Sequence, residues 1–288
     1  MKIKEIFKKK KTTISFEVFP PNKYYSLEEV YSVIDKLSEL GPDFISVTYG
    51  ANGSGMRKTA EIAEKIQSKN ICSLAHLTCI GASKKEIEHV LKDFEKYNIE
   101  NILALRGDPP KEYLNLNEGD FKYASDLVDF LKLKNKYCIG GAVYSETHQE
   151  NNDLLDLFNL KKKVESGTDF LISQMFFDNN NFFEFLEKLK KLEINIPVIA
   201  GIIPITNSKQ IKKITSLCGA KIPPKLQRIL DKYEDNPEAL KEAGIGYATE
   251  QIIELIASDV KGVHIYTMNK PEIAKRIMEN IARIRETF

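Results

Sequence analysis

The chain has 288 residues, of which 42% are hydrophobic and 29% are charged, close to the values of an ordinary folded protein. Its 42 lysines and arginines nearly balance 41 aspartates and glutamates, so no overall positive field attracts nucleic acid or an anionic membrane. No apolar stretch approaches the roughly 20 residues that span a bilayer, and the N-terminus lacks a signal-peptide pattern. We therefore expect a cytoplasmic protein that acts on small molecules.

Short runs rich in β-branched and aromatic residues recur along the chain, each followed by a longer amphipathic segment. This alternation predicts βα units around a parallel sheet. The eight expected strands are residues 13–18, 44–48, 73–78, 102–105, 139–144, 170–174, 198–203 and 263–267. Several are apolar on both faces, as buried parallel strands should be. We predict an α/β fold in which residues 1–288 form a single (β/α)8 TIM barrel.

The expected helices begin and end at recognisable residues. Ser26 and Ser83 each stand three residues before a glutamate, which is the spacing of a capping box, and Gly41 and Gly167 stand where helices should end. The long segment 208–261 predicts extra helices between strands seven and eight, including 225–233 and 246–258. The basic run at 8–11 is typical of a solvated surface.

The four cysteines are Cys72, Cys79, Cys138 and Cys218. They show no CxxC pair and no common metal-binding spacing, so we interpret them as small buried apolar groups and expect no metal site. The sequence also has neither GxGxxG nor GxxxxGK[ST], the markers of Rossmann and P-loop nucleotide binding.

Polar side chains gather at the C-terminal ends of the expected strands, the face that carries the active site in barrel enzymes. They belong to Glu17, Thr48, Tyr49, His76, Thr78, Arg106, Asp108, Tyr144, His148, Gln174, Tyr266 and Lys270, and Gly107 stands between Arg106 and Asp108. Their shared position predicts an active site at this end of the barrel.

Local sequence leaves the roles of several of these residues open. Glu17 lies among Phe16, Val18 and Phe19, and apolar surroundings would favour the protonated carboxyl of a general acid. The alternative is a carboxylate paired with a nearby arginine or lysine. Asp108 precedes proline, a pattern that favours a turn over a site residue.

The histidines and the lysine run 161–163 also allow two interpretations. Taken alone, His76 is typical of a buried core histidine, whereas His148 lies in a polar loop that favours a site. Charge pattern alone favours a solvated lysine face over a contact with a cofactor phosphate. His89 and His264 prompt no functional hypothesis.

Taken together, ten segments resemble the catalytic domain of the methylenetetrahydrofolate reductase family, from about Thr12 to about Arg285. They are FEVFPP (16–21), SVTYGANGSG (46–55), AHLTCIGAS (75–83), LALRGDPP (103–110), YASDLV (123–128), the pair Tyr144 and His148, NLKKKVESG (159–167), ISQMFFD (172–178), GIIPITNSKQIKK (201–213) and HIYTMNK (264–270). The resemblance covers nearly the whole chain and keeps the order of the segments.

The resemblance implies a (β/α)8 barrel that holds a flavin, FAD with FMN left open, and reduces methylenetetrahydrofolate with electrons from NADH or NADPH. It implies Glu17 as the acid that opens the folate ring and Asp108 as the carboxylate beside flavin and pterin. The implied cofactor-binding residues are Thr48, Tyr49, Ala51, His76, Arg106, Gly107, Asp108, Ala124, Tyr144, His148, Asp156, Asn159, Lys162 and Lys163. Gln174, Gln210 and Lys270 match substrate-binding positions.

The chain departs from the family pattern at a few positions. Lys270 and Lys162 stand where arginine is common, and lysine offers a point charge in place of a two-pronged contact. The loop after His148 is one residue shorter. No regulatory domain follows the barrel in this sequence, so nothing in it supports control by adenosylmethionine.

Three other functions remain open on the residues. A proline-dehydrogenase-like barrel flavoenzyme would share the cofactor but need no acid for ring opening. A Schiff-base aldolase would need a lysine at a strand end, and only Lys270 comes close. A non-catalytic folate- or flavin-binding subunit of an electron-transfer complex would not need Glu17, Asp108 and Gln174. We also expect a homo-oligomer and leave open a partner subunit that supplies electrons.

Overall fold

The computed structural model describes residues 1–49, 55–107, 119–146 and 153–287. Eight parallel strands pair in chain order and close into a barrel, β8 pairing with β1. They are β1 (Thr13–Val18), β2 (Phe44–Val47), β3 (Cys72–Thr78), β4 (Asn101–Leu105), β5 (Cys138–Val143), β6 (Phe170–Ser173), β7 (Val198–Ile202) and β8 (Gly262–Tyr266). The predicted barrel is confirmed, and each expected strand end lies within one residue of the observed end.

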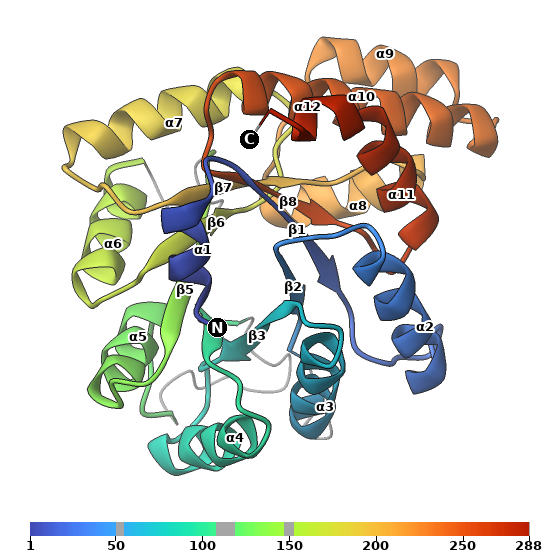
Figure 1. The fold of residues 1–288 in the computed structure, drawn as a ribbon. Coiled ribbons are helices and arrows are strands. Elements are labelled where there is room, and N and C mark those ends of the chain that lie inside the picture. The colour runs from blue at the N-terminus through green and yellow to red at the C-terminus, as the bar shows by residue number, and fades with distance from the viewer. Residues whose placement is uncertain (50–54, 108–118, 147–152, 288) are drawn as a thin grey trace.

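Helices surround the ring of strands (Figure 1). They are α1 (Ile3–Lys9), α2 (Leu27–Ser38), α3 (Gly55–Gln67), α4 (Lys84–Lys96), α5 (Ala124–Leu133), α6 (Asp153–Glu165), α7 (Asn179–Lys191), α8 (Ser208–Cys218), α9 (Pro224–Lys232), α10 (Pro237–Ala257), α11 (Pro271–Asn280) and α12 (Ala282–Arg285). Both predicted capping boxes are present, at Ser26 of α2 and Ser83 of α4. Among the described residues, no helix combines the length and apolar character needed to cross a membrane.

The N-terminal floor of the barrel is apolar, and the sequence did not predict how it is closed. The short helix α1 lies across the barrel opening (Figure 1) and buries Ile3, Ile6 and Phe7. These side chains share one cluster with inward-facing residues of the barrel strands, including Phe44 and Phe170. The ring of Phe7 lies edge-on to that of Phe170, with centroids 5.4 Å apart. Helix α1 therefore plugs the end of the barrel opposite the expected site.

The extra helices between β7 and β8 are α8, α9 and α10. Residues of α8, α9 and α10 join Met175, Phe177 and Ile203, which lie at or beyond the C-terminal ends of β6 and β7, in a separate apolar cluster. The expected helix 246–258 begins earlier, at Pro237 with Asn236 as its cap, because Gly244 lies inside the helix. A Cβ at Gly244 would overlap the backbone of Ile205, so this glycine permits close packing and does not end the helix.

Candidate active site

The carboxyl of Glu17 lies inside the barrel, at the C-terminal end of β1. It is paired in register with Ser46 of β2 and Tyr266 of β8, and it is only 6% exposed. Thr267 fixes its backbone, because Thr267 Oγ1 donates a hydrogen bond to the Glu17 carbonyl oxygen at 2.7 Å. The strand that carries Glu17 is therefore held by β2 on one side and by β8 on the other.

The loop after β8 also holds the residues that follow Glu17. The side chain of Asn269 accepts a hydrogen bond from Phe19 N at 2.9 Å and donates one to Phe19 O at 3.1 Å. Met268 and Asn269 both adopt left-handed backbone conformations, with φ of 53° and 56°. Two such non-glycine residues in succession are costly, so they persist only where the surrounding contacts hold them. Here those contacts hold the segment that follows Glu17.

Two serines and a histidine form a buried polar group beneath Glu17. His264 Nδ1 lies 2.7 Å from Ser15 Oγ, and His264 Nε2 lies 3.2 Å from Ser46 Oγ. Ser46 Oγ donates toward Glu17 Oε2 at 3.5 Å, and His264 Nε2 is 3.8 Å from the same oxygen. Ser15, Ser46 and His264 are fully buried. This polar layer packs against the aromatic floor of the barrel. The ring of Phe44 stacks on that of His264, with centroids 5.9 Å apart.

His76 of β3 approaches Glu17 from the other side, its Nε2 3.5 Å from Glu17 Oε2. Burial lowers the pKa of His76 to about 4, and the neighbouring Glu17 only partly opposes that shift. The imidazole is therefore neutral near pH 7. Its Nε2 is buried and makes no hydrogen bond within the described part of the chain, although buried polar atoms normally have a partner.

Within the described residues, the ion-pair contacts of Glu17 are with His76 and His264, and none involves lysine or arginine. The surroundings of Glu17 thus differ from those of a strand-end carboxylate neutralised by a cation. The described residues therefore provide no cationic partner for the paired-carboxylate interpretation. The general-acid role of Glu17 stays a prediction.

Other predicted cofactor residues lie along the same rim. Thr48, Tyr49, Arg106, Gly107 and Tyr144 are partly buried, and Ala124 is buried at the start of α5. Burial raises the pKa of Tyr49 to about 12. Gly107 has φ of 81°, and a Cβ there would lie 2.9 Å from Thr78 Cβ, so the turn after β4 requires glycine. Ala51, Asp108 and His148 lie outside the described residues.

Helix α6 places its two predicted lysines in different surroundings. Lys163 Nζ donates to Ala142 O of β5 at 2.7 Å, and burial lowers its pKa to about 8 while Asp156 opposes the shift. Lys162 is exposed, whereas Asp156 and Asn159 are partly buried. The solvated-face interpretation therefore fits Lys162, and Lys163 presents a desolvated ammonium group near the end of β5.

The predicted substrate residues follow β6, lie in the first turn of α8 and precede α11. Gln174 follows β6, and its Oε1 accepts a hydrogen bond from Met175 N at 2.9 Å. Gln210 lies in the first turn of α8, where its backbone N donates to Asn207 Oδ1. Lys270 Nζ donates to Thr206 Oγ1 at 3.0 Å. Their roles toward a substrate stay predictions.

Tyr266 of β8 is paired in register with Glu17. Its hydroxyl donates to Ser173 O at 2.8 Å, and burial raises its pKa well above the ordinary value. A Cβ at Gly201 would lie 2.8 Å from that hydroxyl oxygen. Glycine in β7 therefore makes room for the tyrosine.

Sequence reasoning missed Ser15, Ser46 and His264 as members of the site. A signal was present, because successive side chains of a strand alternate between faces. Ser15 therefore shares a face with Glu17, and His264 shares one with Tyr266. What the alternation could not give is the pairing of strands at opposite ends of the sequence, which brings Ser15 beside His264.

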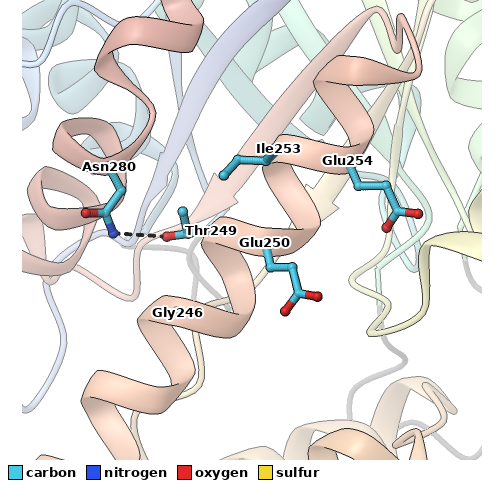
Figure 2. Close-up of a pocket in the computed structure, with 6 residues that line it drawn as sticks. All are labelled: Gly246, Thr249, Glu250, Ile253, Glu254 and Asn280. Carbon is cyan, nitrogen blue, oxygen red and sulfur yellow. Dashed lines mark hydrogen bonds between the residues drawn. The ribbon is translucent and has the colours of Figure 1, made fainter.

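A hollow of about 500 Å³ lies on the outer surface, against α10, and is distinct from the strand-end site (Figure 2). Its lining residues are Gly246, Thr249, Glu250, Ile253, Glu254 and Asn280. Asn280 Nδ2 donates to Thr249 Oγ1 at 3.3 Å across it. Because barrel sites form at the C-terminal ends of strands, we do not assign chemistry to this hollow.

The fold and the site define a (β/α)8-barrel protein with a buried acid at the C-terminal ends of its strands. The family model described as methylenetetrahydrofolate reductase matches residues 2–282. The chain is 36% identical to 5,10-methylenetetrahydrofolate reductase of Escherichia coli K12, covering 93% of this chain and 90% of that protein. The chain belongs to the methylenetetrahydrofolate reductase family, as its sequence segments predicted.

Further relatives set the limits of the match. Methylenetetrahydrofolate reductase (NADH) 1 of Arabidopsis thaliana is 35% identical over 99% of this chain, which spans about half (51%) of that relative's length. A solved Clostridium thermocellum protein described as binding two copies of 5-methyl-5,6,7,8-tetrahydrofolic acid has a TM-score of 0.69 at 14% identity, covering 100% of both chains. That likeness supports the barrel fold.

Proposed function

We propose that the protein reduces 5,10-methylenetetrahydrofolate to 5-methyltetrahydrofolate, using a bound flavin that a reduced nicotinamide reduces in a separate half-reaction. One observation carries the proposal: Glu17 is a buried acid without a lysine or arginine partner in the described residues, at the catalytic end of a family barrel. The names of the relatives support folate as substrate, and that of the Arabidopsis relative supports NADH as donor.

The residues of the rim fit a flavin, and FAD in particular. His76 Nε2 is a buried polar atom that awaits a hydrogen-bond partner. Lys163 is a desolvated cation that suits a pyrophosphate. With Thr48, Tyr49 and Tyr144, these side chains would hold the cofactor, whose chemistry is to accept a hydride from the nicotinamide and deliver one to the folate.

Glu17 performs the step that the folate requires. With its five-membered ring closed, methylenetetrahydrofolate is a poor hydride acceptor. Transfer of the Glu17 proton to the amine nitrogen that leaves breaks the ring C–N bond and gives an iminium cation. The Glu17 carboxylate remains behind and must regain a proton before the next turnover. Asp108, from the family resemblance, would stabilise the cation.

Comparison of the two half-reactions in Glu17→Gln tests the proposal. Glutamine keeps the size and polarity of the side chain but cannot deliver the proton. We expect flavin reduction by NADH or NADPH to stay near the wild-type rate, because that step needs no general acid. Flavin reoxidation by methylenetetrahydrofolate should slow by about 10²–10⁴-fold. Rapid-mixing absorbance follows each half separately.

Three outcomes would contradict the proposal. Protein that binds neither FAD nor FMN would exclude flavin chemistry and favour the aldolase alternative. Flavin that nicotinamide reduces but folate does not reoxidise would favour a different barrel flavoenzyme. Equal slowing of both halves in Glu17→Gln would assign Glu17 a structural role.

A further inference from the structure

We propose that His264 is a positioning residue that, through Ser46, orients the acidic hydrogen of Glu17. This inference rests on the proposed function, in which Glu17 is the acid. Glu17 can serve only if its proton is held at a defined place until the folate binds. The hydrogen bonds beneath Glu17 fix that place.

Both ring nitrogens of His264 contact a serine hydroxyl. Nδ1 lies 2.7 Å from Ser15 Oγ, and Ser15 Oγ also donates to Val263 O at 3.3 Å. Nε2 lies 3.2 Å from Ser46 Oγ. The ring that Ser15 holds through Nδ1 therefore also holds Ser46 through Nε2.

Ser46 is the residue through which His264 acts on Glu17. The Ser46 hydroxyl donates to Glu17 Oε2 at 3.5 Å, and the same hydroxyl oxygen lies 3.2 Å from His264 Nε2. Because Oε2 accepts from Ser46, the acidic hydrogen of a protonated Glu17 is carried by Oε1. His264 thus holds the serine that decides which carboxyl oxygen delivers the proton.

The packing around His264 keeps this arrangement rigid. Phe44 stacks on the ring, and Tyr266 meets it edge-on at 5.4 Å. The Tyr266 hydroxyl is engaged with Ser173 O and does not compete for either nitrogen. The Nε2 of His76, the other imidazole beside Glu17, makes no hydrogen bond within the described residues. His264 is thus the imidazole whose two nitrogens are both held in place.

Four variants test the inference in the holoenzyme. Ser46→Ala removes the link to Glu17, and Ser173→Ala is its matched control, a buried barrel serine whose Oγ accepts from Gly201 N at 2.8 Å. His264→Gln places an amide near the former Nε2, whereas His264→Asn reaches only the Nδ1 side. We expect Ser46→Ala and His264→Asn to slow reoxidation by methylenetetrahydrofolate about tenfold, as for loss of one hydrogen bond, and to leave flavin reduction unchanged.

The conservative variants separate positioning from packing. We expect His264→Gln to keep reoxidation within about threefold of wild type, and Ser173→Ala to leave both half-reactions unchanged. Wild-type reoxidation in Ser46→Ala would overturn the inference. Equal slowing of both half-reactions in His264→Gln and His264→Asn would also overturn it. If His264→Asn fails to fold, Ser46→Ala decides alone.

The Glu17→Gln result tells the two proposals apart. Normal reoxidation in Glu17→Gln would show that Glu17 is not the acid and would contradict the proposed function. Slow reoxidation in Glu17→Gln together with normal reoxidation in Ser46→Ala would contradict only the positioning role of His264.

Discussion

The low pKa of His76 predicts a pH dependence of stability. Its folded-state pKa of about 4 lies below the ordinary value of 6.5, so the unfolded state binds more protons as the pH falls from 6.5 toward 4. The folded state therefore loses stability over this range, by up to about 3 kcal/mol. We expect His76→Gln to flatten the decline in the free energy of unfolding between pH 7 and pH 4.5, measured by urea titration.

The matched control for this prediction is His89→Gln. His89 is exposed on α4, so its substitution should leave the pH dependence as in the wild type. If His76→Gln and wild type lose stability in parallel as the pH falls, the buried neutral imidazole is not the source of the decline.

Single residues also show what the sequence could and could not predict. Glu17 was identified because it ends an expected strand, and the barrel rule then assigned it to the site. Its partners Ser46 and His264 lie 29 and 247 positions away in sequence, and no local pattern measures such separations. Local sequence had left open whether Glu17 is a general acid or a paired carboxylate, and the structure adds that its described contacts are with serine and histidine side chains.

Among the elements, the strands were the most predictable, because buried parallel strands are continuous apolar runs with polar residues at their ends. Helix α1 was not predicted, since seven residues with three lysines give little periodic signal. The start of α10 was placed too late, because Gly244 and Gly246 resemble a helix boundary in sequence. In the fold, the backbone of Ile205 occupies the space that a side chain at Gly244 would need.

Helix α1 yields a prediction of its own. Phe7 is 4% exposed and packs on Phe170 in the barrel floor, so Phe7→Ala leaves a cavity in a place that cannot collapse. We expect a loss of about 3–5 kcal/mol in the free energy of unfolding, measured with denaturant. Flavin affinity should be unchanged, because the floor lies at the other end of the barrel.

Lys8→Ala is the control on the same helix. Lys8 is exposed and its pair is Glu5, three residues before it, so its loss should cost about 0.5 kcal/mol or less. Similar losses in Phe7→Ala and Lys8→Ala would mean that α1 does not support the floor.

At the scale of the whole molecule, ligand binding should increase the free energy of unfolding. A ligand that binds only the folded state raises its stability, by about 2.7 kcal/mol at a concentration one hundred times its dissociation constant. We expect FAD to raise the Tm of ligand-free protein. Lys163→Met should reduce that rise far more than Lys162→Met, because Lys163 presents a desolvated ammonium group and Lys162 is exposed.

Calorimetry with FAD and with FMN measures how much each of the two lysines contributes to flavin affinity. Equal loss of FAD affinity in the two lysine variants would mean that the α6 lysines act only through general charge. No rise in Tm with either flavin would contradict flavin binding at this rim.

The closed floor of the barrel has a consequence for the timing of turnover. Phe7, Phe44 and Phe170 seal the end beneath His264, and the hydrogen-bonded path from Glu17 stops at Val263 O inside the wall. In the proposed reaction, Glu17 would therefore exchange protons with bulk water through the mouth of the barrel, where the substrates would also enter. The acid would be reprotonated while that entrance is vacant, so access of water to the site would set when the next cycle can begin.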